Sequence, residues 1–188
     1  MKKVTFFAFT LFLATASFAQ SAWTADKAHT KLGFTVTHLS ISEVDGTFKS
    51  FDAKITSSKE DFSDAVFELT ADMTQITTNN DMRDGHLKKA DMFDVEKFPT
   101  MTFKSTGITK TADKKYTLAG NLTMKGVTKP VSLDLTLIGT NKNRDGKKLA
   151  GFKVTGTVKR TDFGVGGMPS MMVSENVELR ASGEFVQN

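Results

Sequence analysis

Apolar and polar residues alternate with a period of two through most of this chain. In a β-strand this period places the apolar side chains on one face and Thr, Lys, Ser and Asp on the other. The pattern predicts eight strands, and the second run changes phase near Ser50 as a β-bulge would cause. The apolar runs are Leu32/Phe34/Val36, Phe48 to Ile55, Phe67/Leu69/Ala71/Met73, Met101/Phe103, Tyr116/Leu118/Gly120/Leu122/Met124, Val131/Leu133/Leu135/Leu137, Phe152/Val154/Gly156/Val158 and Val177/Leu179/Ala181.

Polar or glycine-containing segments separate several of these runs, at 57–61, 111–114, 125–126 and 141–146. Short connections of this kind favour antiparallel neighbours. A sheet with one apolar face leaves two edges to protect, and closure into an up-and-down barrel removes both edges and gathers the apolar faces inside. The sequence therefore predicts an all-β, eight-stranded antiparallel barrel. A two-sheet sandwich is the alternative, because periodicity alone does not separate the two.

One segment, 79–94, departs from the alternation. It places Met82, Leu87 and Phe93 at irregular, roughly helical spacings, behind polar residues that are able to cap a helix. We predict a short helix or helical turn here, between strands three and four.

The first 19 residues have the pattern of a secretory signal. Lys2 and Lys3 precede a mostly apolar run that ends near Phe18, and a small residue, Ala19, stands at the expected cleavage point. The sequence predicts a signal peptide at 1–19, cleavage after Ala19, a single domain at 20–188 and a periplasmic or secreted location.

Composition narrows the classes of partner. Loss of Lys2 and Lys3 leaves 23 of the 25 basic residues against 21 acidic ones, so the formal charge falls from +4 to +2. This balance gives no electrostatic reason to expect a nucleic-acid partner. The absence of cysteine excludes thiol chemistry and thiolate metal sites. After the signal no apolar run approaches the roughly 20 residues that span a bilayer, and we expect a monomer or homodimer.

The interior of the predicted barrel is the first candidate site. Its stripes contain Ala71, Gly120, Gly156 and Ala181, which either leave volume unfilled or accommodate close packing in a tapered barrel. An eight-stranded barrel is at the size where either outcome is found. Since the chain has 16 Phe but only one Tyr and one Trp, a cavity would have few polar groups and would suit a hydrocarbon chain.

The second candidate is the polar run Arg83-Asp84-Gly85-His86 in the irregular segment. Arginine can hold an anionic or carbonyl head group, and histidine can donate or accept a hydrogen bond beside it. The competing interpretation is structural, with Arg83 and Asp84 fixing the helix against the barrel rim. No metal-ligand spacing surrounds the three histidines, and no nucleophile motif is present, so we predict neither a metal site nor catalytic residues. Met168, Met171 and Met172 are expected to form an adaptable apolar lip at the barrel mouth.

Seven stretches of the chain resemble the YceI family of exported bacterial proteins, which are lipocalin-like and bind lipids or polyisoprenoids. They follow the family's order from end to end and are 23–29 (WTADKAH), 33–39 (GFTVTHL), 44–48 (VDGTF), 83–87 (RDGHL), 93–99 (FDVEKFP), 120–128 (GNLTMKGVT) and 160–164 (RTDFG). The resemblance implies an apolar tunnel that takes a polyprenyl, quinone-like or fatty-amide chain. It also implies that His38, Arg83, Asp84 and His86 lie near the head group and that Phe98 and Phe163 line the tunnel.

Together the stripes, the lip and the resemblance nominate one set of ligand-binding residues. They are Phe34, Val36, His38, Phe67, Leu69, Arg83, Asp84, His86, Phe98, Phe103, Leu118, Leu122, Leu133, Leu135, Phe152, Val154, Phe163 and Met171. The predicted function is a non-enzymatic binding protein, without a cofactor, that transports, stores or sequesters a polyprenyl phosphate, isoprenoid quinone or fatty amide. The alternatives are an enzyme acting on such a lipid, with His86 as acid-base, and a stress-related interaction protein whose barrel is filled.

Overall fold

The computed structural model describes residues 20–188, so the predicted signal peptide at 1–19 lies outside the described residues. The strand segments are β1 (Ser21–Ala25), β2 (Lys31–His38), β3 (Ser42–Phe48), β4 (Phe51–Ser57), β5 (Val66–Asp72), β6 (Ile76–Thr77), β7 (Thr100–Ala112), β8 (Lys115–Met124), β9 (Val127–Lys142), β10 (Lys148–Lys159) and β11 (Asn176–Gln187). The helical segments are α1 (Asp81–Leu87) and two 3₁₀ turns, η1 (Met73–Gln75) and η2 (Arg160–Phe163).

These eleven segments form eight barrel strands, as the apolar pattern predicted. β1 and β2 pair with different parts of the same strand, β11, and so act as one interrupted strand. β3 and β4 pair with β2 and β1 in the same way, and the break between them spans Lys49 and Ser50. The phase slip near Ser50 therefore marks a real interruption of the second strand.

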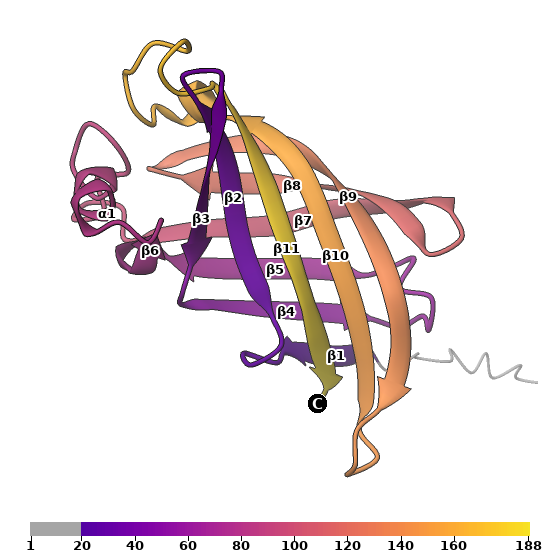
Figure 1. The fold of residues 1–188 in the computed structure, drawn as a ribbon. Helices are drawn as coiled ribbons and strands as arrows, with labels where there is room; N and C mark the ends of the chain where they lie inside the picture. The colour runs from indigo at the N-terminus through magenta and orange to yellow at the C-terminus, as the bar shows by residue number, and fades with distance from the viewer. Residues whose placement is uncertain (1–19) are drawn as a thin grey trace, which may run out of the picture.

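The barrel is closed and antiparallel. Neighbouring strands pair in the order β1, β4, β5, β7, β8, β9, β10 and β11, and β11 pairs back to β1 through Trp23 opposite Gln187. Figure 1 shows the strands crossing at a steep angle around one interior, with α1 beside one end. Closure excludes the sandwich, because the order of paired strands returns from β11 to β1.

The helix α1 forms where the alternation stops. Asn80 precedes it in an extended conformation and accepts a hydrogen bond from the backbone N–H of Arg83 at 3.0 Å, which caps the first turn. The segment follows β6 and precedes β7, so the predicted helix between the third and fourth strands is confirmed. No helix among residues 20–188 is long and apolar enough to cross a membrane.

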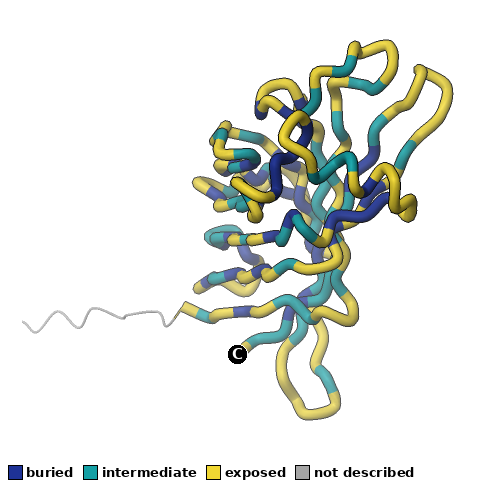
Figure 2. Tube along the Cα trace, turned by 90° about the vertical axis from the view of Figure 1, so that its left-hand side faces the viewer, coloured by how far each residue is buried: buried dark blue, intermediate teal, exposed yellow. Residues whose placement is uncertain are grey.

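The core consists of two apolar clusters, one at each end of the barrel. One is centred on Phe62, Phe152 and Leu135, and the other on Phe48, Met73 and Phe163. Figure 2 shows buried segments along the barrel wall and mostly exposed loops at its ends. The clusters leave space between them, and this space is the candidate site.

The small residues of the stripes have different roles. A Cβ added to Gly120 would lie 2.4 Å from the ring of Phe103, and one added to Gly156 would lie 2.4 Å from Leu133 Cδ2. These glycines therefore accommodate larger neighbours and do not themselves leave empty volume. Ala71 is fully buried in the core, whereas Ala181 lines a cavity.

Candidate functional site

One end of the barrel is closed by aromatic side chains. Phe62, in the loop between β4 and β5, packs edge-on against Trp23 and Phe152, with ring centroids 5.2 and 5.0 Å apart. Phe67 and Phe185 surround Phe152 at 5.4 and 5.8 Å. This packing blocks access to the interior from that end, which we call the closed end.

Above the closed end the interior contains a cavity of about 120 Å³, here called the inner cavity. All eight barrel strands contribute to its wall, which includes Phe67, Phe103, Leu118, Leu133 and Phe152. An engineered apolar cavity of roughly 150 Å³ stays dry and takes up benzene.

A second space of about 270 Å³, the mouth cavity, lies at the opposite end of the barrel. Phe48, Met101, Leu122 and Leu179 line both cavities, so the two spaces adjoin along a shared wall. The mouth cavity reaches α1 and the loop between β10 and β11. Apolar space is thus present on both sides of these four side chains, above the closed end and at a rim with polar side chains.

Arg83 and Asp84 clamp the start of α1 to the preceding strand. The Asp84 carboxylate accepts hydrogen bonds from Thr77 Oγ1 at 2.6 Å and from the backbone N–H and hydroxyl of Thr78 at 2.7 and 2.5 Å. Arg83 donates to Thr78 through Nε at 2.7 Å and through Nη2 at 3.1 Å. Arg83 lines the mouth cavity whereas Asp84 does not. Asp84 therefore has the structural role alone, whereas Arg83 both fixes the helix and lines the mouth cavity.

The buried Asp84 carboxylate makes the fold sensitive to acid. Burial raises the pKa of Asp84, but the hydrogen bonds from Thr77 and Thr78 outweigh it and hold the pKa below the usual value of 3.8. A carboxyl whose pKa is lowered on folding stabilises the protein above its unfolded pKa and loses that contribution as the pH falls through it.

We expect Asp84→Asn to lower the free energy of unfolding by about 2 kcal/mol near neutral pH, because an amide accepts these hydrogen bonds poorly. Denaturant unfolding should show that the difference from the wild type narrows at about pH 3. Asp81→Asn, an exposed change on the same helix, is the control. A difference that is independent of pH would contradict the role of the charge.

The two histidines of the rim have different surroundings. His86, on α1, lies 3.2 Å from the Asp91 carboxylate through Nε2, and both side chains are largely exposed. His38 ends β2 and forms an isolated bridge with Val173 of the loop between β10 and β11. Both histidines line the mouth cavity, so they are placed beside whatever group stands at the mouth.

A buried arginine that the sequence analysis did not nominate organises the rim. The Arg160 side chain donates to five backbone carbonyls, those of Val165, Gly166, Met168, Val173 and Ser174, at 2.6–3.1 Å. It is only 5% exposed, and none of the ion pairs among residues 20–188 involves it. The carbonyl oxygens thus replace both water and a counter-ion. The only sequence signal for this residue was its place in the stretch 160–164.

The structure brings most of the predicted site residues to the two cavities. The inner cavity is lined by Phe67, Leu69, Phe103, Leu118, Leu122, Leu133, Phe152 and Val154. The mouth cavity is lined by Phe34, Val36, His38, Arg83, His86 and again Leu122. Five predicted residues line neither cavity, namely Asp84, Phe98, Leu135, Phe163 and Met171.

Those five residues have other surroundings. Leu135 and Phe163 are buried in the two core clusters. Phe98 packs over Gly126, where an added Cβ would lie 2.6 Å from its ring. Met171 is 79% exposed. Periodicity shows which face a residue occupies, but not whether its neighbours fill the space in front of it.

One group of potential metal ligands lies away from the cavities. Side-chain atoms of Asp26, His29 and Glu184 lie within 4.8 Å of one another where β1 passes into β2. His29 Nδ1 is 2.8 Å from Asp26 Oδ2, and Asp26 Oδ1 accepts from the backbone N–H of Ala28 at 2.8 Å. The contact with Asp26 raises the pKa of His29. These bonds stabilise the turn without a metal, so the group is explained by the fold.

Comparison with known proteins identifies relatives of the whole barrel. The model of the YceI-like domain family matches residues 23–185. A protein named YceI from Salmonella newport is 37% identical over 179 residues, which cover 94% of this chain and 93% of that protein.

Solved structures agree on the fold. The Campylobacter jejuni YceI protein superposes with a TM-score of 0.74 at 32% identity, covering 81% of this chain and 90% of that one. A polyisoprenoid binding domain from Saccharophagus degradans superposes with a TM-score of 0.63 at 15% identity, covering 92% and 100%. At that identity the second likeness concerns the fold alone.

Proposed function

The chain belongs to the YceI-like family, and on that premise we propose that it holds one long isoprenoid or related lipid chain inside the barrel. The lipid classes are a polyprenyl phosphate, an isoprenoid quinone or a fatty amide, and the role is transport, storage or sequestration. The observation that carries the proposal is the pair of adjoining apolar cavities inside the barrel, one above the closed end and the other at the rim.

The energetics of the cavity favour a chain-like guest. Burial of each CH₂ contributes about 0.8 kcal/mol, so a few isoprene units offset the cost of association without precise polar contacts. Phenylalanine and leucine supply half of the residues that line the inner cavity. A polyisoprenoid is the ligand named for the Saccharophagus degradans domain of the same fold, and this supports the same chemical class here.

The polar residues at the rim support a head group at the mouth. His38, Arg83 and His86 line the mouth cavity, and the two hydrogen bonds of Arg83 to Thr78 use only Nε and Nη2. Its Nη1 group is available to a phosphate or carbonyl oxygen. The lipid tail would then lie toward the closed end.

Native mass spectrometry of protein purified from its own host tests the proposal directly. We expect an adduct with the mass of a hydrophobic lipid. A clean mass of the free protein, together with no uptake of polyprenyl phosphate, quinone or fatty amide, would overturn the proposal.

Arg83→Gln separates a head-group role from a structural one. We expect it to weaken binding of a polyprenyl phosphate about tenfold, because a charge-assisted hydrogen bond is lost. Binding of an isoprenoid hydrocarbon of similar length, which has no head group, should change less than about twofold. Titration with both lipids measures the effect, and Lys129→Gln on the outer wall of the barrel is the control. Equal losses for the two lipids would indicate that Arg83 acts through the fold.

We propose binding without catalysis. The interior is mainly hydrocarbon, and Asp84 is fully engaged by Thr77 and Thr78. Turnover of a bound lipid that disappears in His86→Ala would overturn this. Export through residues 1–19 belongs to the same proposal, and sequencing of the mature N-terminus from a periplasmic extract tests it, with Gln20 as the expected first residue.

A further inference from the structure

Most exposed apolar side chains of the described chain gather around the mouth. Among residues 20–188, six large apolar side chains are exposed. Four of them, Leu39, Ile41, Met171 and Met172, come from the β2–β3 turn and the loop between β10 and β11, and we call them the crown. Ile41 and Met171 are 85% and 79% exposed. Exposed apolar side chains that gather in one place, and are not scattered singly, are typical of an interaction surface.

The crown continues the wall of the mouth cavity outward. His38 and Val173 line that cavity and pair with each other. The next residues along each segment are Leu39 and Met172, and the backbone N–H of Leu39 donates to the carbonyl of Met172 at 3.0 Å. Figure 1 shows the two segments side by side at the top of the barrel. A molecule that leaves the mouth here meets apolar side chains before it meets water.

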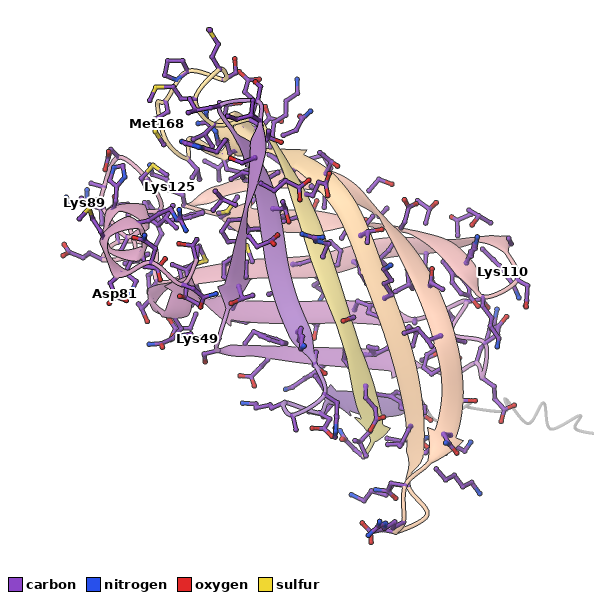
Figure 3. The ribbon with its side chains drawn as sticks, in the orientation of Figure 1. Lys49, Asp81, Lys89, Lys110, Lys125 and Met168 are labelled. Atoms are coloured by element: carbon purple, nitrogen blue, oxygen red, sulfur yellow. The ribbon has the colours of Figure 1, made fainter. Side chains whose placement is uncertain are left out.

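The crown is held in place by the fold. Arg160 binds the carbonyls of Met168 and Val173 on either side of Met171 and Met172. Lys125 Nζ donates to the carbonyl of Gly164, at the start of the same loop, at 2.8 Å. Figure 3 shows Lys125 and Met168 near this rim and Lys110 at the far side of the barrel. The exposed apolar groups are therefore presented by an ordered scaffold.

The backbone at the tip forms a tight hairpin turn, in which the N–H of Ile41 donates to the carbonyl of His38 at 3.1 Å. Leu39 and Ser40 have φ of 50° and 59°, in the left-handed region that glycine and asparagine adopt most readily. A leucine at this position is strained and also exposed. The exposure of the Leu39 side chain is unfavourable in water and would be relieved in an apolar medium, whereas its backbone conformation belongs to the hairpin turn.

We propose that the crown inserts into the surface of a phospholipid bilayer and places the mouth cavity against the membrane. The purpose of this membrane docking rests on the proposed lipid-binding function. A lipid tail that passes directly from the bilayer into the barrel avoids water. Each methylene that must cross water lowers the chance of transfer about fourfold. The exposed charged residues nearest the crown along the chain, Glu43, Lys159, Asp162 and Glu175, are three acids and one base, so insertion is expected to depend on the apolar side chains and not on attraction to anionic lipids.

Co-sedimentation with phosphatidylcholine and phosphatidylethanolamine vesicles tests the proposal. We expect the wild type to bind, and the double variant Leu39→Asn, Ile41→Ser to bind at least about tenfold more weakly. Asparagine suits the left-handed conformation, so this variant should fold as well as the wild type, which thermal unfolding checks. Ile138→Ser, which removes an exposed apolar side chain of β9 that is not part of the crown, should bind vesicles like the wild type.

A fluorescent label gives a second readout in this cysteine-free chain. An environment-sensitive dye on Ile41→Cys should shift to the blue with vesicles, whereas the same dye on Lys110→Cys should not. The proposal is overturned if the wild type does not bind vesicles, or if the double variant binds them equally well. The crown would then be assigned to a protein partner.

The two proposals fail separately. Lipid binding is measured without vesicles, by uptake of a lipid delivered from cyclodextrin, and the crown variants should keep this uptake. Uptake without vesicle binding overturns only the crown. Vesicle binding without uptake leaves the membrane-docking surface in place and overturns the carrier function, and with it the purpose assigned to the surface.

Discussion

Ala181→Leu should weaken binding of a long lipid chain about fiftyfold. Ala181 lies on β11 opposite Val154 and Leu32 and lines the inner cavity. Leucine adds three carbons to a space of about 120 Å³ and displaces a similar number of methylenes of the guest. At about 0.8 kcal/mol per CH₂ the loss is about 2.4 kcal/mol, or roughly fiftyfold in the dissociation constant.

The same substitution should stabilise the free protein by about 1 kcal/mol, because it fills an empty apolar space. A lipid short enough to occupy only the mouth cavity should bind as it does to the wild type. Ala119→Leu makes the same change at an exposed position of β8 and should affect neither quantity. Titration with a series of chain lengths, beside denaturant unfolding, measures both. Unchanged affinity for the longest chain would show that the tail does not occupy the inner cavity.

Arg160→Ala should cost the fold about 3–5 kcal/mol. Removal of the side chain leaves five backbone carbonyls without their donors in a buried place, and unsatisfied buried polar groups cost about 1–3 kcal/mol each before water replaces the lost contacts. Arg160→Lys should cost less, since an ammonium group supplies three donors in place of five. Urea unfolding measures the loss, with Arg144→Ala in the exposed β9–β10 turn as control.

Loop order and stability should change together in the Arg160 variants. Hydrogen exchange of the amides between Gly164 and Ser174 should accelerate selectively, because their scaffold is lost. A change confined to global stability, with that loop still protected, would show that other contacts hold the rim.

The strands were predictable because the signal for each is local. A period of two in Val131/Leu133/Leu135/Leu137 is a property of one strand and survives into the structure as β9. Short stretches of sequence likewise encode the turn at Lys125 and Gly126 and the interruption near Ser50. Cavity lining was predicted less well, as Leu135 shows, since it continues an inward stripe but lies in packed core.

The rim was the least predictable part of the candidate site. Arg83 and Asp84 stood out as polar residues in an irregular segment, but their hydrogen bonds to Thr77 and Thr78 depend on how α1 returns to β6. Arg160 was missed as a site residue because its partners follow it by 5 to 14 residues and are all backbone carbonyls, which leave no trace in side-chain composition.

The sequence by itself determined that this chain forms eight antiparallel strands around an apolar interior, because alternation and turns encode strand faces and connections locally. The tertiary structure alone decided whether that interior is hollow. Gly120 and Gly156 make room for Phe103 and Leu133, while Ala181 borders empty space. The physical reason is that volume belongs to sets of side chains from different strands, so it is defined only when the barrel has closed.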